Sequence, residues 1–100
     1  SRADDGLHLG LGRALEARAA LAGGPAAQRD RDLAADEYRA ALPYGPDRLA
    51  ALEGLARLAI DEGRLRDARR YLVLAAGDVR AGDRVDAALE EVDRRIEAGG

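Results

Sequence analysis

The sequence predicts an all-α fold of about five helices, paired as antiparallel hairpins and stacked into a short helical array. The first observation is a repeated spacing, because Leu55 and Leu89 are 34 residues apart and two longer patterns keep the same interval. Those patterns are Ala34-x3-Tyr38-x2-Ala41 and Ala68-x3-Leu72-x2-Ala75. A fixed period of this length is typical of helix pairs that bury their apolar faces against one another.

The composition gives the second observation. The 100 residues include 23 alanines and 15 leucines, but only four valines, two isoleucines and no threonine. Alanine, leucine and arginine favour helices, whereas the residues that favour strands are scarce. Small alanine side chains also allow helix axes to approach closely. The sequence therefore indicates helices packed on helices.

The first two helices are predicted on either side of a glycine-rich break. Asp4 and Asp5 are suitable caps for a helix whose apolar side chains recur at three- and four-residue steps up to residue 22. The pair Gly23-Gly24 interrupts this pattern, and Pro25 fits the first turn of a second helix. Residues 43–46 include two prolines and are predicted to form a turn.

Three further helices follow from similar signals. Asp47 is predicted to cap the third helix, and Gly63 to end it in the left-handed conformation. Gly77 closes the fourth helix, and Gly82 with Asp83 opens the fifth. Four Glu-to-Arg pairs at i, i+4 spacing are expected to add weak ion pairs on a solvated surface: Glu53–Arg57, Glu62–Arg66, Glu90–Arg94 and Glu91–Arg95.

These motifs resemble the tetratricopeptide repeat. The first unit reads His8-x2-Leu11-Gly12-x2-Leu15, then Ala34-x3-Tyr38, Ala41 and Pro46. The second reads Leu52-x2-Leu55-Ala56-x2-Ala59, then Gly63, Ala68, Leu72 and Ala75. The resemblance implies one domain over residues 1–100, with repeats at about 4–46 and 47–80 and a capping helix at about 83–97. The capping helix carries Glu90 and Asp93 where small or apolar residues belong.

The first unit departs from the pattern in length. Gly12 and Ala34 are 22 residues apart, against 12 between Ala56 and Ala68, so about ten residues are extra. They either lengthen both helices of the first hairpin or form an enlarged loop at 23–32. We favour longer helices, because the sequence around Gly23 and Gly24 is rich in alanine.

The residue types argue against catalysis and against cofactor or metal binding. The chain contains no cysteine, lysine or threonine, and its one serine is Ser1, so no nucleophile lies beside a base. His8 is the single histidine and is expected to pack at the edge of the first helix or to face solvent. Carboxylates that are neighbours on a helix do not face each other, which disfavours an acid–base pair. We predict that the chain is not an enzyme and that it has no cofactor.

Charge and hydropathy limit the partners. The net charge of −3 and the three aromatic residues do not suit nucleic-acid binding, and no apolar run is long enough for a membrane span. All 16 basic residues are arginine, a bias typical of GC-rich bacterial genomes. The chain carries no signal segment, its cellular compartment is not indicated, and the ends at Ser1 and Gly100 favour a segment of a longer protein.

The predicted function is a protein-interaction module or scaffold that binds a peptide or partner protein on its concave face. In tetratricopeptide arrays, the first helix of each pair lines that face. Positions carried across by the repeat spacing give the candidate partner-binding residues Leu9, Arg13, Glu16, Glu53, Arg57, Ile60, Asp61, Glu91, Arg94 and Arg95. Members that clamp a carboxylate with lysine and asparagine are disfavoured, since the chain has neither residue. The alternatives are a solvated inner face covered in a longer protein, a homodimeric structural segment, or an accessory domain of a larger bacterial enzyme or regulator.

Overall fold

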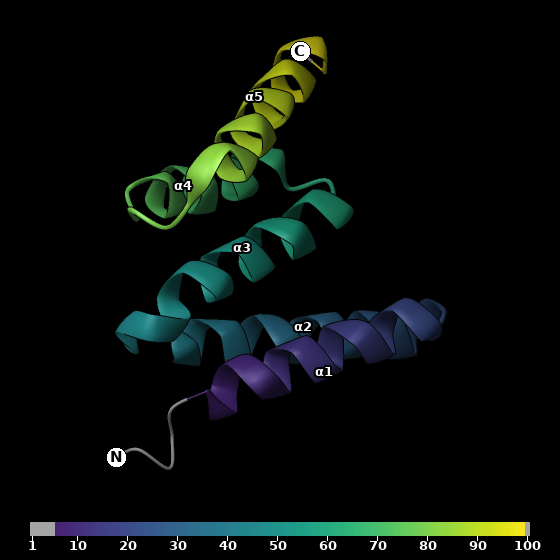
Figure 1. The fold of residues 1–100 in the computed structure, drawn as a ribbon. Helices are drawn as coiled ribbons and strands as arrows, with labels where there is room; N and C mark the ends of the chain where they lie inside the picture. Colours follow the sequence, from purple (N-terminus) through teal and green to yellow (C-terminus); the bar gives the residue numbers. More distant parts are fainter. Residues whose placement is uncertain (1–5, 100) are drawn as a thin grey trace.

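The computed structural model describes residues 6–99, and this part of the chain is all-α. Its five helices are α1 (Leu7–Leu21), α2 (Gly24–Ala41), α3 (Gly45–Asp61), α4 (Leu65–Ala76) and α5 (Gly82–Ala98) (Figure 1). The described residues contain no strand. The predicted all-α class and the predicted number of helices are confirmed.

The helices form a thin, extended stack. Each helix packs against the next one in the chain, and α1 also contacts α3. Figure 1 shows α1, α3 and α5 following one another along the molecule, with α2 and α4 behind them. The Cα atoms span 43 × 37 × 16 Å, and the short dimension fits two layers of helices.

The first hairpin extends further beyond the repeat positions than the second one does. α1 continues nine residues past Gly12 and α2 begins ten residues before Ala34, whereas α3 continues five residues past Ala56 and α4 begins three residues before Ala68. α1 has 15 residues and α2 has 18, so only Ala22 and Gly23 lie between them. The prediction that the extra residues lengthen the helices is confirmed. Arg18 on α1 donates two hydrogen bonds of 2.8 Å to the buried Asp30 on α2, which joins the extended halves. The hydrogen bonds from Arg18 hold the pKa of Asp30 below its ordinary value.

Two predicted helix starts differ from those observed. α1 begins after Gly6, which has a positive φ of 79°, and the predicted caps Asp4 and Asp5 lie outside the described residues. α3 begins at Gly45, because Pro46 fits within a first turn, so Asp47 lies inside the helix. The Asp47 carboxylate instead accepts a hydrogen bond of 2.8 Å from the Gly6 backbone N–H, joining the starts of α1 and α3.

Of the two predicted glycine stops, one uses the left-handed conformation. Gly63 has φ 74° after α3, as predicted. Gly77 ends α4 with φ −74°, in the right-handed region. Its N–H bonds to the Leu74 carbonyl at 3.2 Å, a tightened last turn that needs no positive φ.

Tyr38 fills the junction between the first hairpin and α3. Its side chain is fully buried. A Cβ atom added to Gly12 would lie 2.7 Å from the Tyr38 ring, and one added to Gly54 would lie 2.6 Å from it. The ring therefore occupies the space that two absent side chains leave on α1 and α3.

Leu72 occupies a related place between the second hairpin and α5. It is 3% exposed, belongs to the same apolar cluster as Ala56 and Val85, and has the partly buried Ala88 packed against that cluster. Ala56 and Ala88 also line, with Leu72, a hollow of about 100 Å³. Tyr38 and Leu72, which are 34 residues apart, thus have comparable surroundings.

Candidate functional site

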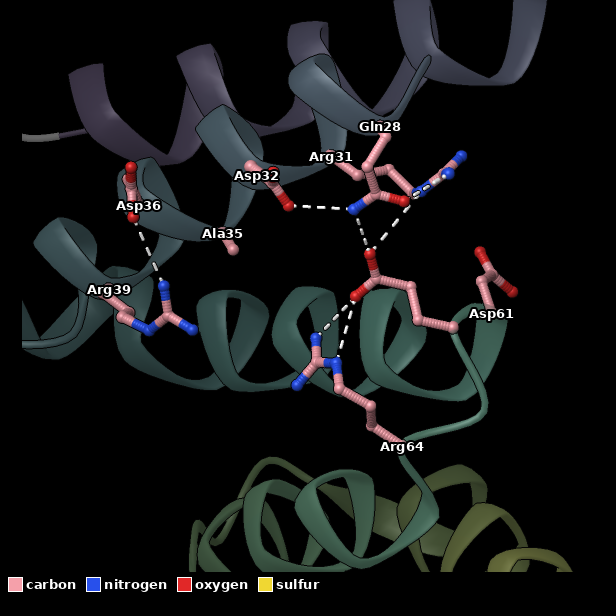
Figure 2. A pocket seen from close by; sticks show the side chains of 9 residues that line it. Gln28, Arg31, Asp32, Ala35, Asp36, Arg39, Asp61 and Arg64 are labelled. Atoms are coloured by element: carbon pink, nitrogen blue, oxygen red, sulfur yellow. Dashed lines mark hydrogen bonds and ion pairs between the residues drawn. The ribbon is translucent and has the colours of Figure 1, made fainter. Parts of the chain in front are cut away.

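A charged cleft lies between α2 and the turn from α3 to α4 (Figure 2). Its volume is about 640 Å³. We call it the α2 cleft, and it is lined by Gln28, Arg31, Asp32, Ala35, Asp36, Arg39, Asp61, Glu62 and Arg64.

One face of α2 supplies most of the lining. The six α2 residues of the cleft recur at three- and four-residue steps from Gln28 to Arg39, the spacing of a single helix face. Ala35 lies in the middle of this stripe and is 7% exposed. Its short side chain leaves room between the longer polar side chains around it.

Glu62 is the centre of the polar network in the cleft. Its carboxylate accepts hydrogen bonds from Gln28 Nε2 at 2.5 Å and from Arg64 Nη2 at 2.6 Å. Arg31 Nε lies 3.8 Å from Glu62 Oε2. The hydrogen bond from Gln28, together with Arg64, outweighs burial and holds the pKa of Glu62 below its ordinary value. Glu62 is therefore a fixed anion that ties α2 to the end of α3.

The rim of the cleft is more open. Arg39 lies 3.3 Å from Asp36, and the side chains of both residues are at least half exposed. Asp61 is exposed at the end of α3 and lines the same cleft. Arg31 Nε is buried and has no hydrogen-bond partner among the described residues. The lining thus offers guanidinium groups and carboxylates to charges of both signs.

Two predicted site residues on the α1–α3–α5 side are paired with each other. Arg57 on α3 donates to Glu16 on α1 through Nε at 3.0 Å and Nη2 at 3.1 Å. The hydroxyl of Tyr38 also donates to Glu16. Burial disfavours the charged carboxylate, but the bonds from Arg57 and Tyr38 outweigh it and lower the pKa of Glu16. Burial and the bond to Glu16 raise the pKa of Tyr38 to about 12.

A second pair joins α3 to α5. Arg84 donates to Glu53 at 2.7 and 3.0 Å, which occupies both oxygens of another predicted site residue. Ile60 is half-buried and packs against the core cluster around Leu72. These contacts leave the predicted concave face with much of its charge already neutralised within the chain.

Leu9 requires a correction, because it does not lie on an open surface. Leu9 is 8% exposed and belongs to the core cluster of Tyr38. The physical reason is that α1 contacts α3 directly, so the side of α1 that faces α3 is covered. Arg13, by contrast, is exposed.

The predicted residues on α5 do not join those on α1 and α3 in one site. Arg94 donates to its own neighbour Glu91 at 2.6 Å. Arg95 lines a separate hollow of about 440 Å³ with Ile96 and the start of α4. The predicted set therefore divides between a paired face, the rim of the α2 cleft at Asp61, and the far end of α5.

None of the four i, i+4 ion pairs expected from the sequence is formed among the described residues, and other contacts replace them. Glu53 and Arg57 pair with residues on different helices, and Glu62 lies beyond the end of α3, where it meets Arg64. His8, expected at an edge, lies 2.7 Å from Glu37 and stacks on Tyr44 with ring centroids 6.3 Å apart.

The sequence analysis missed the α2 side of the cleft. The signal was present, because polar residues recur along α2 on a single face that is distinct from the face carrying Tyr38. Which of these residues would meet the end of α3 depends on the packing of α2 against α3 and not on α2 alone.

None of the family models, curated proteins or solved structures compared with this chain matches it. Within residues 6–99, no helix combines the length and the hydropathy needed to cross a bilayer. The same residues contain no group of three or more histidine or acidic side chains placed to hold a metal ion.

Proposed function

We propose that this chain is a protein-interaction module of the tetratricopeptide type, and that a charged segment of a partner protein lies in the α2 cleft. The array assignment is supported by the comparable surroundings of Tyr38 and Leu72 at positions 34 residues apart. Arrays of this kind present extended surfaces to peptides and proteins.

The single observation that carries the site is the α2 cleft itself. A hollow of about 640 Å³ has room for several side chains of a peptide. Its floor at Ala35 is small and apolar, whereas Arg39 and Asp61 stand at its rim. A peptide with an acidic side chain toward Arg39 and a basic one toward Asp61 complements this arrangement.

The predicted concave face is a weaker candidate for the same function. Glu16 and Arg57 satisfy each other there, as do Glu53 and Arg84. A partner that used these groups would first have to separate pairs that join neighbouring helices, which costs binding free energy. We therefore propose the α2 cleft as the binding site in place of the predicted concave face, and the proposed class of function is unchanged.

Selection from a displayed library of random peptides tests the proposal. Peptides enriched on the full chain are measured for affinity against Asp61→Arg and Arg39→Glu, which reverse charges at the cleft rim. We expect each reversal to weaken binding about tenfold, equivalent to about 1.4 kcal/mol. Arg13→Glu is the matched control, because Arg13 is exposed on α1 and does not line the cleft.

Two results would contradict this assignment. If Arg13→Glu lowers the affinity and Asp61→Arg does not, the peptide binds the α1–α3–α5 face and not the α2 cleft. A library that yields no enriched peptide on the folded chain would argue against peptide binding itself.

Self-association is a second candidate, since three leucines of α1, Leu7, Leu11 and Leu21, are 48%, 43% and 91% exposed. Sedimentation over a range of chain concentrations tests it directly.

A further inference from the structure

The outward side of α1 is apolar and uncovered. Leu7 is 48% and Leu11 43% exposed, and the neighbouring Gly10 and Ala14 on the same side of the helix are also exposed. We call these four residues the outer face of α1. Contiguous exposed apolar surface is typical of sites at which another element docks.

The same four positions are covered on the other two helices of this layer. The residues 44 positions further on, in α3, are largely buried and lie at the junction with the first hairpin: Ala51, Gly54, Leu55 and Leu58. Another 34 positions on, the residues of α5 lie in or against the cluster around Leu72: Val85, Ala88, Leu89 and Val92. Within this chain, these positions are therefore the ones by which a helix packs onto the hairpin before it.

Gly10 shows what kind of side chain is missing. Its counterpart Gly54 lies under the ring of Tyr38, where an added Cβ would be 2.6 Å from the ring. Around Gly10, nothing lies within 4 Å of an added Cβ. Glycine inside a helix is less favourable than alanine, so Gly10 destabilises α1. No described residue packs against Gly10 to compensate for this loss.

We propose that the outer face of α1 seats a further antiparallel helix hairpin, which places an aromatic side chain over Gly10 as Tyr38 lies over Gly54. The interface continues one already present twice in this molecule, at α3 and at α5. The partner surface is thus a pair of helices of the same construction as α1 and α2.

The chain's own surfaces do not supply this occupant. None of its three tyrosines is exposed, and Tyr38 is fully buried, so a second copy brings no ring to Gly10. At the other end of the stack, α5 carries the exposed Asp86 and Glu90 at the positions by which α3 meets α4. Copies stacked end to end would therefore place carboxylates against leucines, which disfavours that assembly.

The experiment supplies the hairpin in cis to the full chain. A second copy of residues 1–44 placed before Ser1 puts its Tyr38 sixteen residues ahead of Gly10, the same separation as between Tyr38 and Gly54. Thermal unfolding is then compared for Gly10→Ala in the 100-residue chain and in the extended chain. We expect Gly10→Ala to raise the Tm of the 100-residue chain by about 4 °C through helix propensity. In the extended chain, we expect the same change to lower the Tm by several degrees, because the methyl group meets the added ring.

A second variant keeps the test valid if the added ring adjusts its position. Leu11→Glu is expected to leave the Tm of the 100-residue chain nearly unchanged and to lower that of the extended chain. Leu74→Glu is the matched control, because Leu74 is 54% exposed on α4 and lies away from the outer face. It should have the same small effect in both chains.

Three outcomes would overturn the proposal. One is a Tm that Gly10→Ala raises equally in both chains, and another is an equal effect of Leu11→Glu on both. The third is a dimer of the 100-residue chain, seen by sedimentation, that Leu11→Glu dissociates, because the face would then belong to a second copy.

Discussion

At the first junction of the stack a tyrosine lies between α1 and α3, whereas at the second junction a leucine occupies the corresponding position between α3 and α5. Tyr38 is flanked by Gly12 and Gly54, and the equivalent positions around Leu72 are Ala56 and Ala88. The larger side chain faces glycines, and the smaller one faces alanines. The comparison teaches that the size of the central side chain at each junction is matched to the size of its two neighbours.

The junctions also differ in their polar contacts. The Tyr38 hydroxyl reaches Glu16, which Arg57 holds from α3, so the aromatic residue and an ion pair form one network. At the second junction, Glu53 and Arg84 bridge α3 and α5, while Leu72 offers no polar atom. The first junction should therefore be the more sensitive of the two to pH and to polar substitution.

Truncation of the central side chains should give the largest effect. Tyr38→Ala removes a fully buried ring from between two glycines, and we expect a loss of about 3–5 kcal/mol in the free energy of unfolding. Leu72→Ala should cost less, about 2–3 kcal/mol, because the alanines beside it already fill part of the space. Urea denaturation followed by circular dichroism measures both values. Equal losses would remove the distinction between the junctions.

Alkaline pH should weaken the first junction, and this effect should be the second largest. Burial and the bond to Glu16 raise the pKa of Tyr38 from 10.0 to about 12, so the native state keeps this proton more strongly than the unfolded chain does. The associated stability is present below pH 10 and is lost as the pH rises toward 12, a change of about 3 kcal/mol. Tyr38→Phe should abolish this part of the pH dependence. An unchanged alkaline limb in Tyr38→Phe would contradict the burial argument.

Removal of the Glu16 charge should have a smaller effect. Glu16→Gln weakens its bonds with Arg57 and Tyr38, and we expect a loss of about 1 kcal/mol at pH 7. Because the native pKa of Glu16 is lowered, its contribution is present above pH 4.5 and is lost as the pH falls through the native pKa. The loss caused by Glu16→Gln should therefore shrink in acid. Glu53→Gln is the matched control at the second junction, and it should change stability less, because Glu53 pairs with the exposed Arg84 and the central Leu72 offers no hydroxyl like that of Tyr38.

The composition and the three- and four-residue apolar steps were sufficient to predict the five helices, because helix formation depends on local periodicity. The lengthening of α1 and α2 was predictable for the same reason, from helix propensity around Gly23 and Gly24. The candidate site was harder to predict from the sequence. The burial of Leu9, the pairing of Glu16 with Arg57 and the α2 cleft all depend on how neighbouring helices pack, which single-helix patterns do not contain.

A double-mutant cycle between Gly54 and Tyr38 tests the central claim most directly. Gly54→Ala alone should destabilise the chain by about 1–2 kcal/mol, since the added methyl group meets the ring despite better helix propensity. Tyr38→Leu makes room for that methyl group. The double variant Tyr38→Leu/Gly54→Ala should therefore lose about 1–2 kcal/mol less free energy of unfolding than the two single losses added together. Losses that add to within about 0.5 kcal/mol would show that the two residues do not share this space, and the matching of sizes at the junctions would be contradicted.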